Sequence, residues 1–156
     1  MNVDPSTFRA VLSHVPTAVA VVTAIDGTEP CGMTIGSLGS LSREPPLVLF
    51  CVAREARSHP ALRTADRYCV SVLAHDQSAV ARRFADRDPD RFRYGMFRLH
   101  GLPAVVGAAA WLLCARHELV SGGDHTLVIA RVEQATHGSS PPLVYHRRSF
   151  RTLIPA

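Results

Sequence analysis

The stretch Gly32-Met33-Thr34-Ile35-Gly36-Ser37-Leu38-Gly39-Ser40-Leu41-Ser42 decides how the rest of the chain is interpreted. It follows an alternating apolar run and precedes Pro45-Pro46 and a second apolar run, residues 47–52. Its glycines lower strand propensity, so they indicate close approach of the backbone to a ligand. Side-chain hydroxyls that can donate hydrogen bonds to an anion come from Thr34, Ser37, Ser40 and Ser42. Composition alone leaves open an ordinary Ser/Gly-rich loop between two strands.

The length and composition predict one globular domain covering residues 1–156. No apolar segment approaches the roughly 20 residues that a membrane span needs, so we expect no membrane partner. The N-terminus lacks a basic region followed by a hydrophobic one, so we expect no signal peptide and a cytoplasmic location. The 4 cysteines are far apart and show no C-x-x-C or metal-ligand spacing. They predict packing in the core and no metal site.

The net charge of +4 comes from arginine alone, because the sequence contains no lysine. The arginines are scattered over the chain and do not form one basic stripe interleaved with aromatic residues. Nucleic-acid binding would want such a stripe. The charge pattern therefore argues against a nucleic-acid partner and favours small ligands that carry phosphate.

The hydrophobic pattern predicts many strands and few helices. We expect an N-terminal helix that begins after Asp4 or Ser6 and ends before Pro16, a short helix over 60–65, and a helix over 77–85 capped by Asp76. Strands are expected over 18–25, 31–37, 47–52, 68–73, 110–119, 126–134 and 143–146. Residues 86–103 are expected to form a long polar loop, and 147–156 a tail. Without a βαβ rhythm, this order predicts a mainly β fold, a small barrel rather than a doubly wound sheet.

Several catalytic motifs are absent from the sequence: G-x-S-x-G, H-E-x-x-H, the Walker A loop and G-x-G-x-x-G. Four clusters remain as candidates for a dinucleotide or flavin site. They are residues 32–42, the loop 53–59, Arg82-Arg83-Phe84, and Gly122–His125 together with Tyr145–Arg148. Each also has a structural interpretation: Ser58 as a helix N-cap, Arg82-Arg83 as a solvated helix face, Asp124-His125 as a hairpin turn, and Tyr145-His146 as the end of an edge strand.

Taken in order, these segments resemble the short-chain NAD(P)H:flavin oxidoreductases, which are the reductase components of two-component flavin-dependent monooxygenases. The similarity runs nearly end to end. The segments that carry it are Phe8-Arg9, 15–24, 32–37, 40–42 with 45–52, 81–85, 123–129 and 142–146. Each motif is weak alone, but their order and spacing are specific.

The resemblance implies an FMN-binding split β-barrel with a few covering helices, a homodimer, and a flavin reductase-like domain. It implies FMN or FAD and NADH as ligands, with NADPH possible, and a flavin-dependent monooxygenase as partner. Residues implied to line or hold the flavin are Thr34, Ile35, Gly36, Ser37, Ser40, Cys51, Val52, Ala53, Arg57, Ser58, Arg83 and Phe84. Residues implied at the nicotinamide nucleotide are Asp124, His125, Tyr145, His146, Arg147 and Arg148.

Hydride transfer to a flavin needs two stacked rings rather than a strong protein acid or base, so positioning is the main contribution expected of the protein. His125 is the candidate catalytic residue, because an imidazole with a pKa of about 6.5 can orient a carboxamide or protonate reduced flavin. Gly39 stands where the family would have a larger residue, and Ala130 departs from a common Gly-Arg-Val ending. Two alternatives remain: an enzyme that retains its flavin and acts on a small organic substrate, and a non-catalytic flavin- or haem-binding protein.

Overall fold

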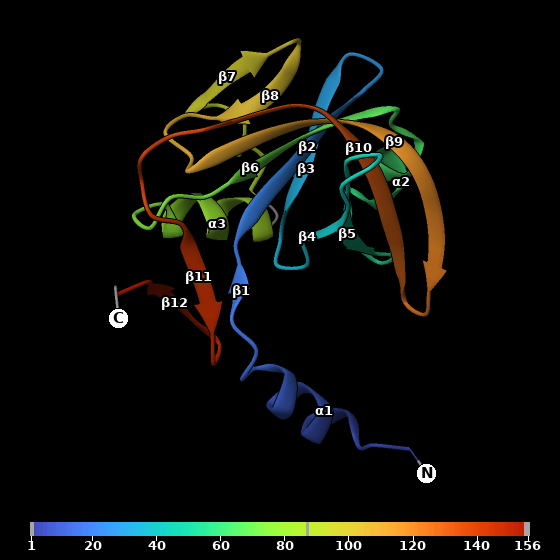
Figure 1. The fold of residues 1–156 in the computed structure, drawn as a ribbon, viewed down its shortest axis with the longest axis vertical. Helices are drawn as coiled ribbons and strands as arrows, with labels where there is room; N and C mark the ends of the chain where they lie inside the picture. Colours follow the sequence, from blue (N-terminus) through green and yellow to red (C-terminus); the bar gives the residue numbers. More distant parts are fainter. Residues whose placement is uncertain (1, 87, 155–156) are drawn as a thin grey trace.

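The computed structural model describes residues 2–86 and 88–154 and consists mainly of β-strands (Figure 1). The helices are α1 (Pro5–Leu12), α2 (His59–Thr64) and α3 (Ser78–Ala85). The strands are β1 (Thr17–Ala18), β2 (Ala20–Asp26), β3 (Glu29–Ile35), β4 (Gly39–Ser42), β5 (Leu47–Ala53), β6 (Arg67–Val72), β7 (Met96–Leu99), β8 (Leu102–Val105), β9 (Ala110–Gly122), β10 (His125–His137), β11 (Leu143–His146) and β12 (Ser149–Thr152).

The central sheet has the antiparallel strand order β3-β2-β6-β9-β10-β5-β4. Its two edges, β3 and β4, are close in sequence, and the segment after β3 is fastened to β5. The backbone amide of Cys51 donates a hydrogen bond of 2.8 Å to Ser37 Oγ. The sheet therefore curls back on itself into a barrel, with β3 and β4 as its two edge strands. The expectation of a small, mainly β barrel is confirmed.

The barrel interior is filled by side chains that alternate along the strands. Phe50 and Tyr68 meet edge to face at a ring-centroid distance of 5.4 Å. The Tyr68 hydroxyl donates to the carbonyl oxygens of Leu62 and Ala65 at the end of α2, and burial raises the pKa of Tyr68 to about 12. The expected packing of cysteines in the core holds for Cys31, Cys69 and Cys114, whereas Cys51 is half-buried.

Helix α1 projects away from the barrel (Figure 1). Its start is set by Asp4, whose carboxylate accepts hydrogen bonds from the backbone amides of Ser6 and Thr7, as the sequence predicts. No residue of α1 is buried, and Phe8 and Val11 remain 53% and 60% exposed. An apolar helix face without a partner in its own chain indicates an interaction surface.

Four elements differ from the sequence-based prediction. Strand β4 forms inside the Gly/Ser stretch, the β7–β8 hairpin forms within and just after the expected loop 86–103, and β12 forms in the expected tail. The β7–β8 hairpin is stabilised by tertiary contact, because Phe97 meets the Trp111 ring edge to face at 6.0 Å. Asp76 does not cap α3; Gln77 occupies the N-cap and its side chain bonds to Ala74 and Val106.

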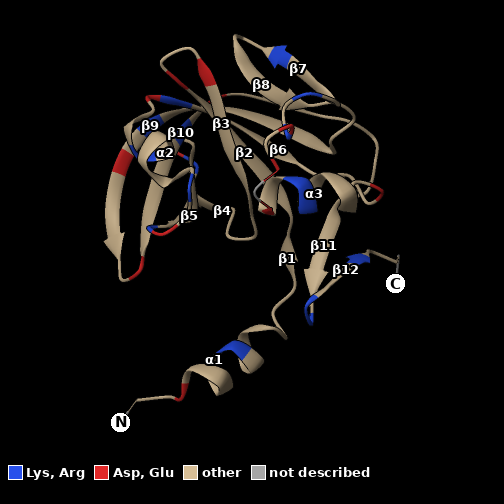
Figure 2. Ribbon diagram, turned by 180° about the vertical axis from the view of Figure 1, so that it is seen from behind, with Lys and Arg blue, Asp and Glu red and all other residues tan. Residues whose placement is uncertain are grey.

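Two observations limit how the chain can meet other molecules. In the part of the chain that the structure describes, no helix has the length and apolar character needed to cross a membrane. Across the described residues, arginines are distributed over helices, strands and loops and do not form one continuous stripe (Figure 2). The scattered arginines of the sequence therefore stay scattered in space, apart from two pairs that each line a cavity described below, Arg57 with Arg91 and Arg82 with Arg148.

Candidate active site

A first cavity, which we call the basic pocket, has a volume of about 560 Å³. It lies between β3, the loop after β5 and the end of α3. The residues that line it are Gly32, Met33, Thr34, Ala53, Glu55, Ala56, Arg57, Ser58, Phe84, Ala85, Asp86 and Arg91. Five of the predicted flavin-binding residues are among them: Thr34, Ala53, Arg57, Ser58 and Phe84.

Arg57 and Arg91 make the basic pocket suitable for an anion. Burial, and then the positive charge of Arg57, lower the pKa of the Arg91 guanidinium. The buried Nε of Arg91 has no hydrogen-bond partner. Glu55 and Asp86 also line the cavity, but among the described residues neither forms an ion pair with the two arginines. A phosphate group would satisfy both guanidinium groups with charge-assisted hydrogen bonds.

The wall of the basic pocket depends on close packing between β2, β3 and α2. Ser58 occupies the N-cap position of α2 but makes no capping hydrogen bond. Its buried hydroxyl donates instead to the carbonyl oxygen of Gly32 at 2.9 Å. A Cβ on Gly32 would lie 2.6 Å from the carbonyl oxygen of Val22. Gly32 therefore permits the approach of two backbones, and Ser58 joins the loop to that strand.

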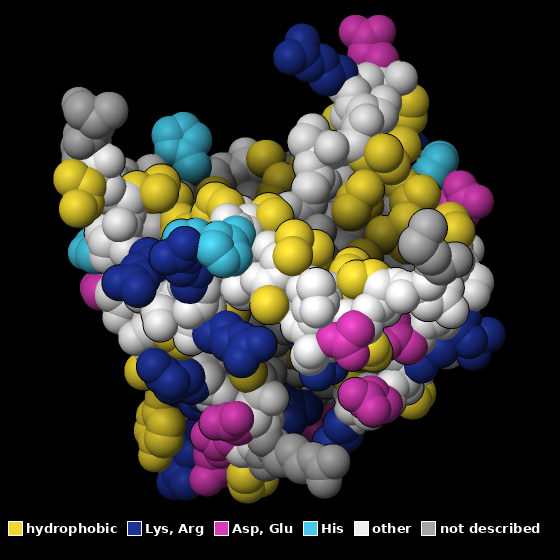
Figure 3. Space-filling view, turned by 90° about the horizontal axis from the view of Figure 1, so that it is seen from below, with side chains coloured by type: hydrophobic (Ala, Val, Ile, Leu, Met, Phe, Trp, Pro, Cys, Tyr) yellow, Lys and Arg dark blue, Asp and Glu magenta, His cyan; other side chains and the backbone are white. Residues whose placement is uncertain are grey.

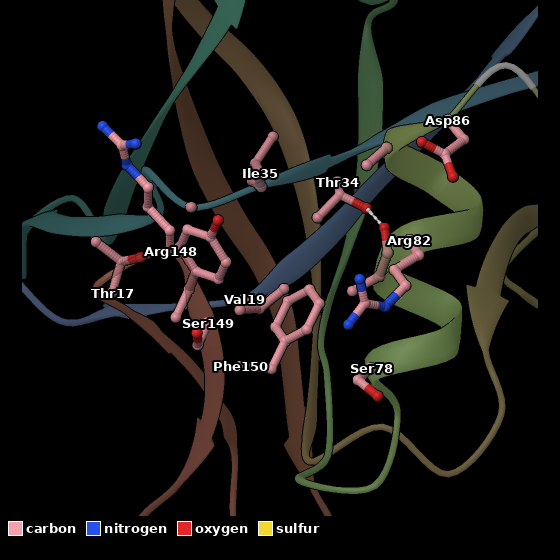
Figure 4. A pocket seen from close by; sticks show the side chains of 14 residues that line it. Thr17, Val19, Thr34, Ile35, Ser78, Arg82, Asp86, Arg148, Ser149 and Phe150 are labelled. Atoms are coloured by element: carbon pink, nitrogen blue, oxygen red, sulfur yellow. Dashed lines mark hydrogen bonds between the residues drawn. The ribbon is translucent and has the colours of Figure 1, made fainter. Parts of the chain in front are cut away.

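A second cavity, which we call the aromatic pocket, has a volume of about 890 Å³ and adjoins the first (Figure 4). The two cavities share Thr34, Ala85 and Asp86. The residues that line the aromatic pocket are Thr17, Val19, Thr34, Ile35, Gly36, Ser78, Ala81, Arg82, Ala85, Asp86, Tyr145, Arg148, Ser149 and Phe150. It brings the predicted flavin residues Thr34, Ile35 and Gly36 together with the predicted nucleotide residues Tyr145 and Arg148.

Aromatic and basic groups face each other in the aromatic pocket. The Arg82 guanidinium lies 5.1 Å from the centroid of the Phe150 ring (Figure 4), and the Tyr145 and Phe150 rings meet at 5.3 Å. The Thr34 hydroxyl donates to the carbonyl oxygen of Ala81 at 2.6 Å, which holds β3 against α3. A flat ring with a phosphate nearby matches this combination of an aromatic face and a cation.

The turn between β11 and β12 positions Arg148 by an unusual backbone. His146 pairs with Ser149, so Arg147 and Arg148 form a two-residue hairpin loop. Both have left-handed φ angles, 49° and 61°. Such a turn normally carries Asn or Gly, because a side chain is disfavoured there. Arginine at both of these disfavoured positions therefore indicates a use for their charges.

The predicted catalytic residue, His125, lies at the turn between β9 and β10. Its Nδ1 is 2.7 Å from Asp124 Oδ1. The hydrogen bond from His125, and next its charge, lower the pKa of the Asp124 carboxyl. The two side chains are 43% and 93% exposed, in that order. The Asp124 carboxylate thus fixes the orientation of the imidazole through Nδ1.

Other predicted residues line neither cavity. Ser37 accepts a hydrogen bond from β5, and the Val52 side chain is buried in the core. Arg83 donates to the carbonyl oxygen of Tyr94 and so supports the loop that carries Arg91. The remaining ones are Ser40, Cys51, His146 and Arg147, together with Asp124 and His125. Their roles toward a ligand stay predictions.

Arg91 and Phe150 line the pockets although the sequence did not indicate them, and Arg82, which belongs to a candidate cluster but was not assigned to the flavin, lines the aromatic pocket. Arg91 lies in the expected polar loop 86–103, and Phe150 lies in the expected tail. A signal in the sequence that could have identified these pocket arginines is an aromatic residue close to them in the chain. Arg91 precedes Phe92 directly, and the Arg91 guanidinium lies 5.6 Å from that ring.

Comparison with known proteins agrees with this geometry. The model of the flavin reductase like domain matches residues 12–153. The chain is 37% identical over 159 residues to an NADH:riboflavin 5'-phosphate oxidoreductase of Streptomyces pristinaespiralis, covering 98% of this chain and 90% of that protein. It is 35% identical over 159 residues to the reductase subunit of a flavin-dependent monooxygenase of Mycobacterium tuberculosis, covering 99% and 85%.

The fold is similar to that of a solved flavin reductase. The NADH:FAD oxidoreductase of Streptomyces globisporus, in complex with NAD and FAD fragments, superposes with a TM-score of 0.92 at 39% identity. The match covers 99% of this chain and 98% of that one. The mainly β barrel is therefore the split barrel of these reductases, and the resemblance inferred from the sequence is confirmed. The chain belongs to the family of flavin reductase-like domains.

Proposed function

We propose that this protein is an NADH-dependent flavin reductase that supplies reduced FMN or FAD to a partner monooxygenase. NADH delivers a hydride to the flavin, and the protein contributes position and charge. The observation that carries the proposal is the pair of adjoining cavities that meet at Thr34. One cavity contains two arginines that form no ion pair with the described residues and can bind a phosphate, and the other contains aromatic and hydroxyl groups that can bind a ring.

Different residues of the two pockets bind different parts of the ligands. Arg57 and Arg91 hold the flavin phosphate, and the small residues of β3 let the ring lie against the backbone. Arg148 and Tyr145 hold the nicotinamide nucleotide. His125, oriented by Asp124, holds the carboxamide or gives a proton to the reduced flavin. Packing the two rings together supplies most of the rate enhancement, because it turns an encounter in solution into a step within one complex.

The same proposal includes a homodimer. Helix α1 presents an apolar face that its own barrel does not cover. On β5 and β10, Phe50, Val52, Val128 and Ala130 face the core, so alternate residues on both strands face outward. Several of these outward residues are apolar and half-buried: Leu49, Cys51, Leu127 and Ile129. A second copy would cover both surfaces.

Steady-state kinetics test the proposal. The purified protein is mixed with NADH or NADPH and an excess of FMN or FAD, and oxidation of the reduced nucleotide is followed by absorbance. We expect a protein that purifies without colour and oxidises NADH at a rate that saturates with flavin. A yellow protein that is inert to NADH would contradict the proposal and favour a flavin carrier.

The role of His125 is tested separately. Replacing His125 with Asn keeps a polar side chain but removes the proton donor, and we expect kcat to fall by about 100-fold, the lower end of the range for general acid–base catalysis. His117→Asn, an exposed histidine on the same hairpin, is the matched control. If the two variants oxidise NADH equally fast, His125 has no catalytic role.

A further inference from the structure

The two segments that the proposed function assigns to different ligands are joined directly. We call residues 53–59, which carry Arg57 and Ser58, the phosphate loop. We call residues 121–126, which carry Asp124 and His125, the hairpin tip. The backbone amide of Arg54 donates to the carbonyl oxygen of Asp124 at 2.9 Å. This bond extends the β5–β10 ladder, which ends at the pair of Ala53 and His125.

Two side chains add to this backbone connection. Arg54 Nη2 donates to Ser121 Oγ at 2.6 Å. His59 Nε2 lies 2.8 Å from Thr126 Oγ1, and this contact is partly buried. Arg54 and His59 thus reach from opposite ends of the phosphate loop to opposite ends of the hairpin tip. Neither side chain lines either pocket, so these contacts are not themselves ligand contacts.

The hairpin tip has little other support. Strand β6 pairs with β9 only as far as Ala115, so among the described strands the outer part of β9 pairs with β10 alone. Gly123 at the turn has a left-handed φ of 65°, and Asp124 is almost fully exposed. Strand β10 pairs with β5 as far as His125, so the turn at residues 122–124 is the part of the hairpin that lies beyond a third strand, and its local stability is low unless something holds it. Here the phosphate loop holds it.

We propose that Arg54 and His59 couple flavin binding to nicotinamide-nucleotide binding by tying the phosphate loop to the hairpin tip. A phosphate bound at Arg57 and Ser58 orders the loop, and the ordered loop orders the tip. The nucleotide then binds to a tip whose conformational entropy is already reduced. This proposal rests on the proposed function and adds that the two binding events are cooperative.

Cooperativity must be reciprocal. If flavin raises the affinity for the nucleotide by a given factor, the nucleotide raises the affinity for flavin by the same factor. Arg54 and His59 are positioning residues in this scheme, because they act through Asp124 and His125. Removing the Arg54 or His59 contact should reduce the coupling factor, whereas the flavin Kd measured without nucleotide should change little.

Thr126 allows the sharpest test. Thr126→Val removes the hydroxyl that contacts His59 and keeps the shape of the side chain, whereas Thr126→Ser retains the hydroxyl. Thr64→Val is the matched control, because the Thr64 hydroxyl bonds only to carbonyl oxygens within α2. Arg54→Ala tests the second connection. Circular dichroism and thermal unfolding verify that every variant is folded.

The readout is the flavin Kd, measured by fluorescence quenching with and without saturating NAD⁺, which binds without reducing the flavin. FMN and FAD are both titrated, and the tighter one is used. We expect NAD⁺ to tighten flavin binding by about fivefold or more in the unaltered protein, the lower end of typical coupling factors. Thr126→Val and Arg54→Ala should bring the ratio close to one, and Thr126→Ser and Thr64→Val should keep it.

Two results would overturn the coupling: a ratio of one in the unaltered protein, or an undiminished ratio in both Thr126→Val and Arg54→Ala. Neither result contradicts the proposed function, because that function requires only that the protein binds flavin and oxidises NADH. Failure of the unaltered protein to bind flavin or oxidise NADH would instead contradict the proposed function itself. The two hypotheses are therefore tested by different measurements.

Discussion

At the scale of single residues, the informative feature is the approach of Arg57 and Arg91 in one cavity. Two like charges near each other destabilise one another, and the lowered pKa of Arg91 reflects burial first and this repulsion second. A protein retains such an arrangement when a ligand compensates it. The pair is thus better explained as a phosphate site than as a contribution to stability.

We predict that Arg91→Ala weakens flavin binding by about 10- to 100-fold, because a hydrogen bond to a charged group contributes about 1.5–3 kcal/mol. The Kd is measured by fluorescence quenching of the flavin. Arg93→Ala is the control: Arg93 is nearby in sequence, but it is exposed and pairs with Asp90 at 3.9 Å. Equal flavin affinity in the two variants would rule out a phosphate contact by Arg91.

At the scale of elements, β3 serves both the fold and the site. It pairs with β2 along its whole length, contacts α3 through Thr34, and contributes residues to both pockets. Its one glycine, Gly32, and Gly39 on β4 have different roles. Gly32 is required by the close approach of β2 and α2, whereas a Cβ on Gly39 would make an ordinary contact of 3.6 Å with Leu49.

We predict that Gly32→Ala destabilises the protein by about 1–3 kcal/mol, the range for overpacking, because its Cβ would lie 2.6 Å from a backbone oxygen of β2. Urea unfolding followed by fluorescence measures the change. Gly39→Ala should stay within about 0.5 kcal/mol of the unaltered protein. A Gly32→Ala protein as stable as Gly39→Ala would show that β2 and β3 can separate without cost.

Gly39 also bears on how flavin is used. Because the family would have a larger residue at this position, Gly39 could leave the face of the flavin ring more open. Since Gly39 lies on β4 and lines neither pocket, a substitution there is expected to change flavin affinity little. The distinction between a released flavin and a retained one therefore depends on the pocket residues, with Arg57 and Arg91 first among them.

At the scale of the whole molecule, the barrel and α1 have different relations to solvent. The barrel buries its apolar side chains, and α1 leaves its own exposed. Seen from below, the end of the molecule exposes hydrophobic side chains between charged ones (Figure 3). An exposed apolar surface of this extent favours association, and symmetric dimers are the commonest result.

We predict that Phe8→Ser combined with Val11→Ser converts a homodimer into monomers of 16.9 kDa. The barrel should stay folded, because neither side chain contributes to its core. Light scattering coupled to size exclusion gives the mass, and Arg9→Ser, on the same helix, is the control. A dimeric double variant, or a monomeric unaltered protein, would contradict a dimer held by α1.

We predict that stability falls above about pH 9. Burial raises the pKa of Cys69 from 9.0 to about 11 and that of Cys114 to about 12. Below pH 9 the folded and unfolded thiols both keep their protons; above it only the unfolded ones release them. Each thiol then lowers the unfolding free energy by about 1.4 kcal/mol per pH unit.

Urea unfolding between pH 8 and pH 10.5 tests this effect, because the unfolded Cys69 thiol loses its proton above about pH 9 while the folded one, with a pKa of about 11, still keeps it. Cys69→Ala should flatten the decline, whereas Val70→Ala, an equally buried neighbour on β6, should lower stability without changing the slope. Identical slopes in the two variants would show that the Cys69 thiol does not contribute to the alkaline decline.

The sequence alone determined the class of fold, most strand positions and the family. Strand alternation and the Asp4 cap are local signals, and both were confirmed. The split-barrel topology came from the family resemblance. Half of the predicted site residues reach the two cavities: Thr34, Ile35, Gly36, Ala53, Arg57, Ser58, Phe84, Tyr145 and Arg148.

Only the tertiary structure decided which charges meet. Arg57 and Arg91 are brought together by the packing of the 53–59 loop against the end of α3. The link from Arg54 and His59 to the hairpin tip joins residues 67 positions apart. No local pattern encodes such contacts, because they depend on how strands distant in sequence close into a barrel. The sequence specified the elements, and closure of the barrel assembled the site from them.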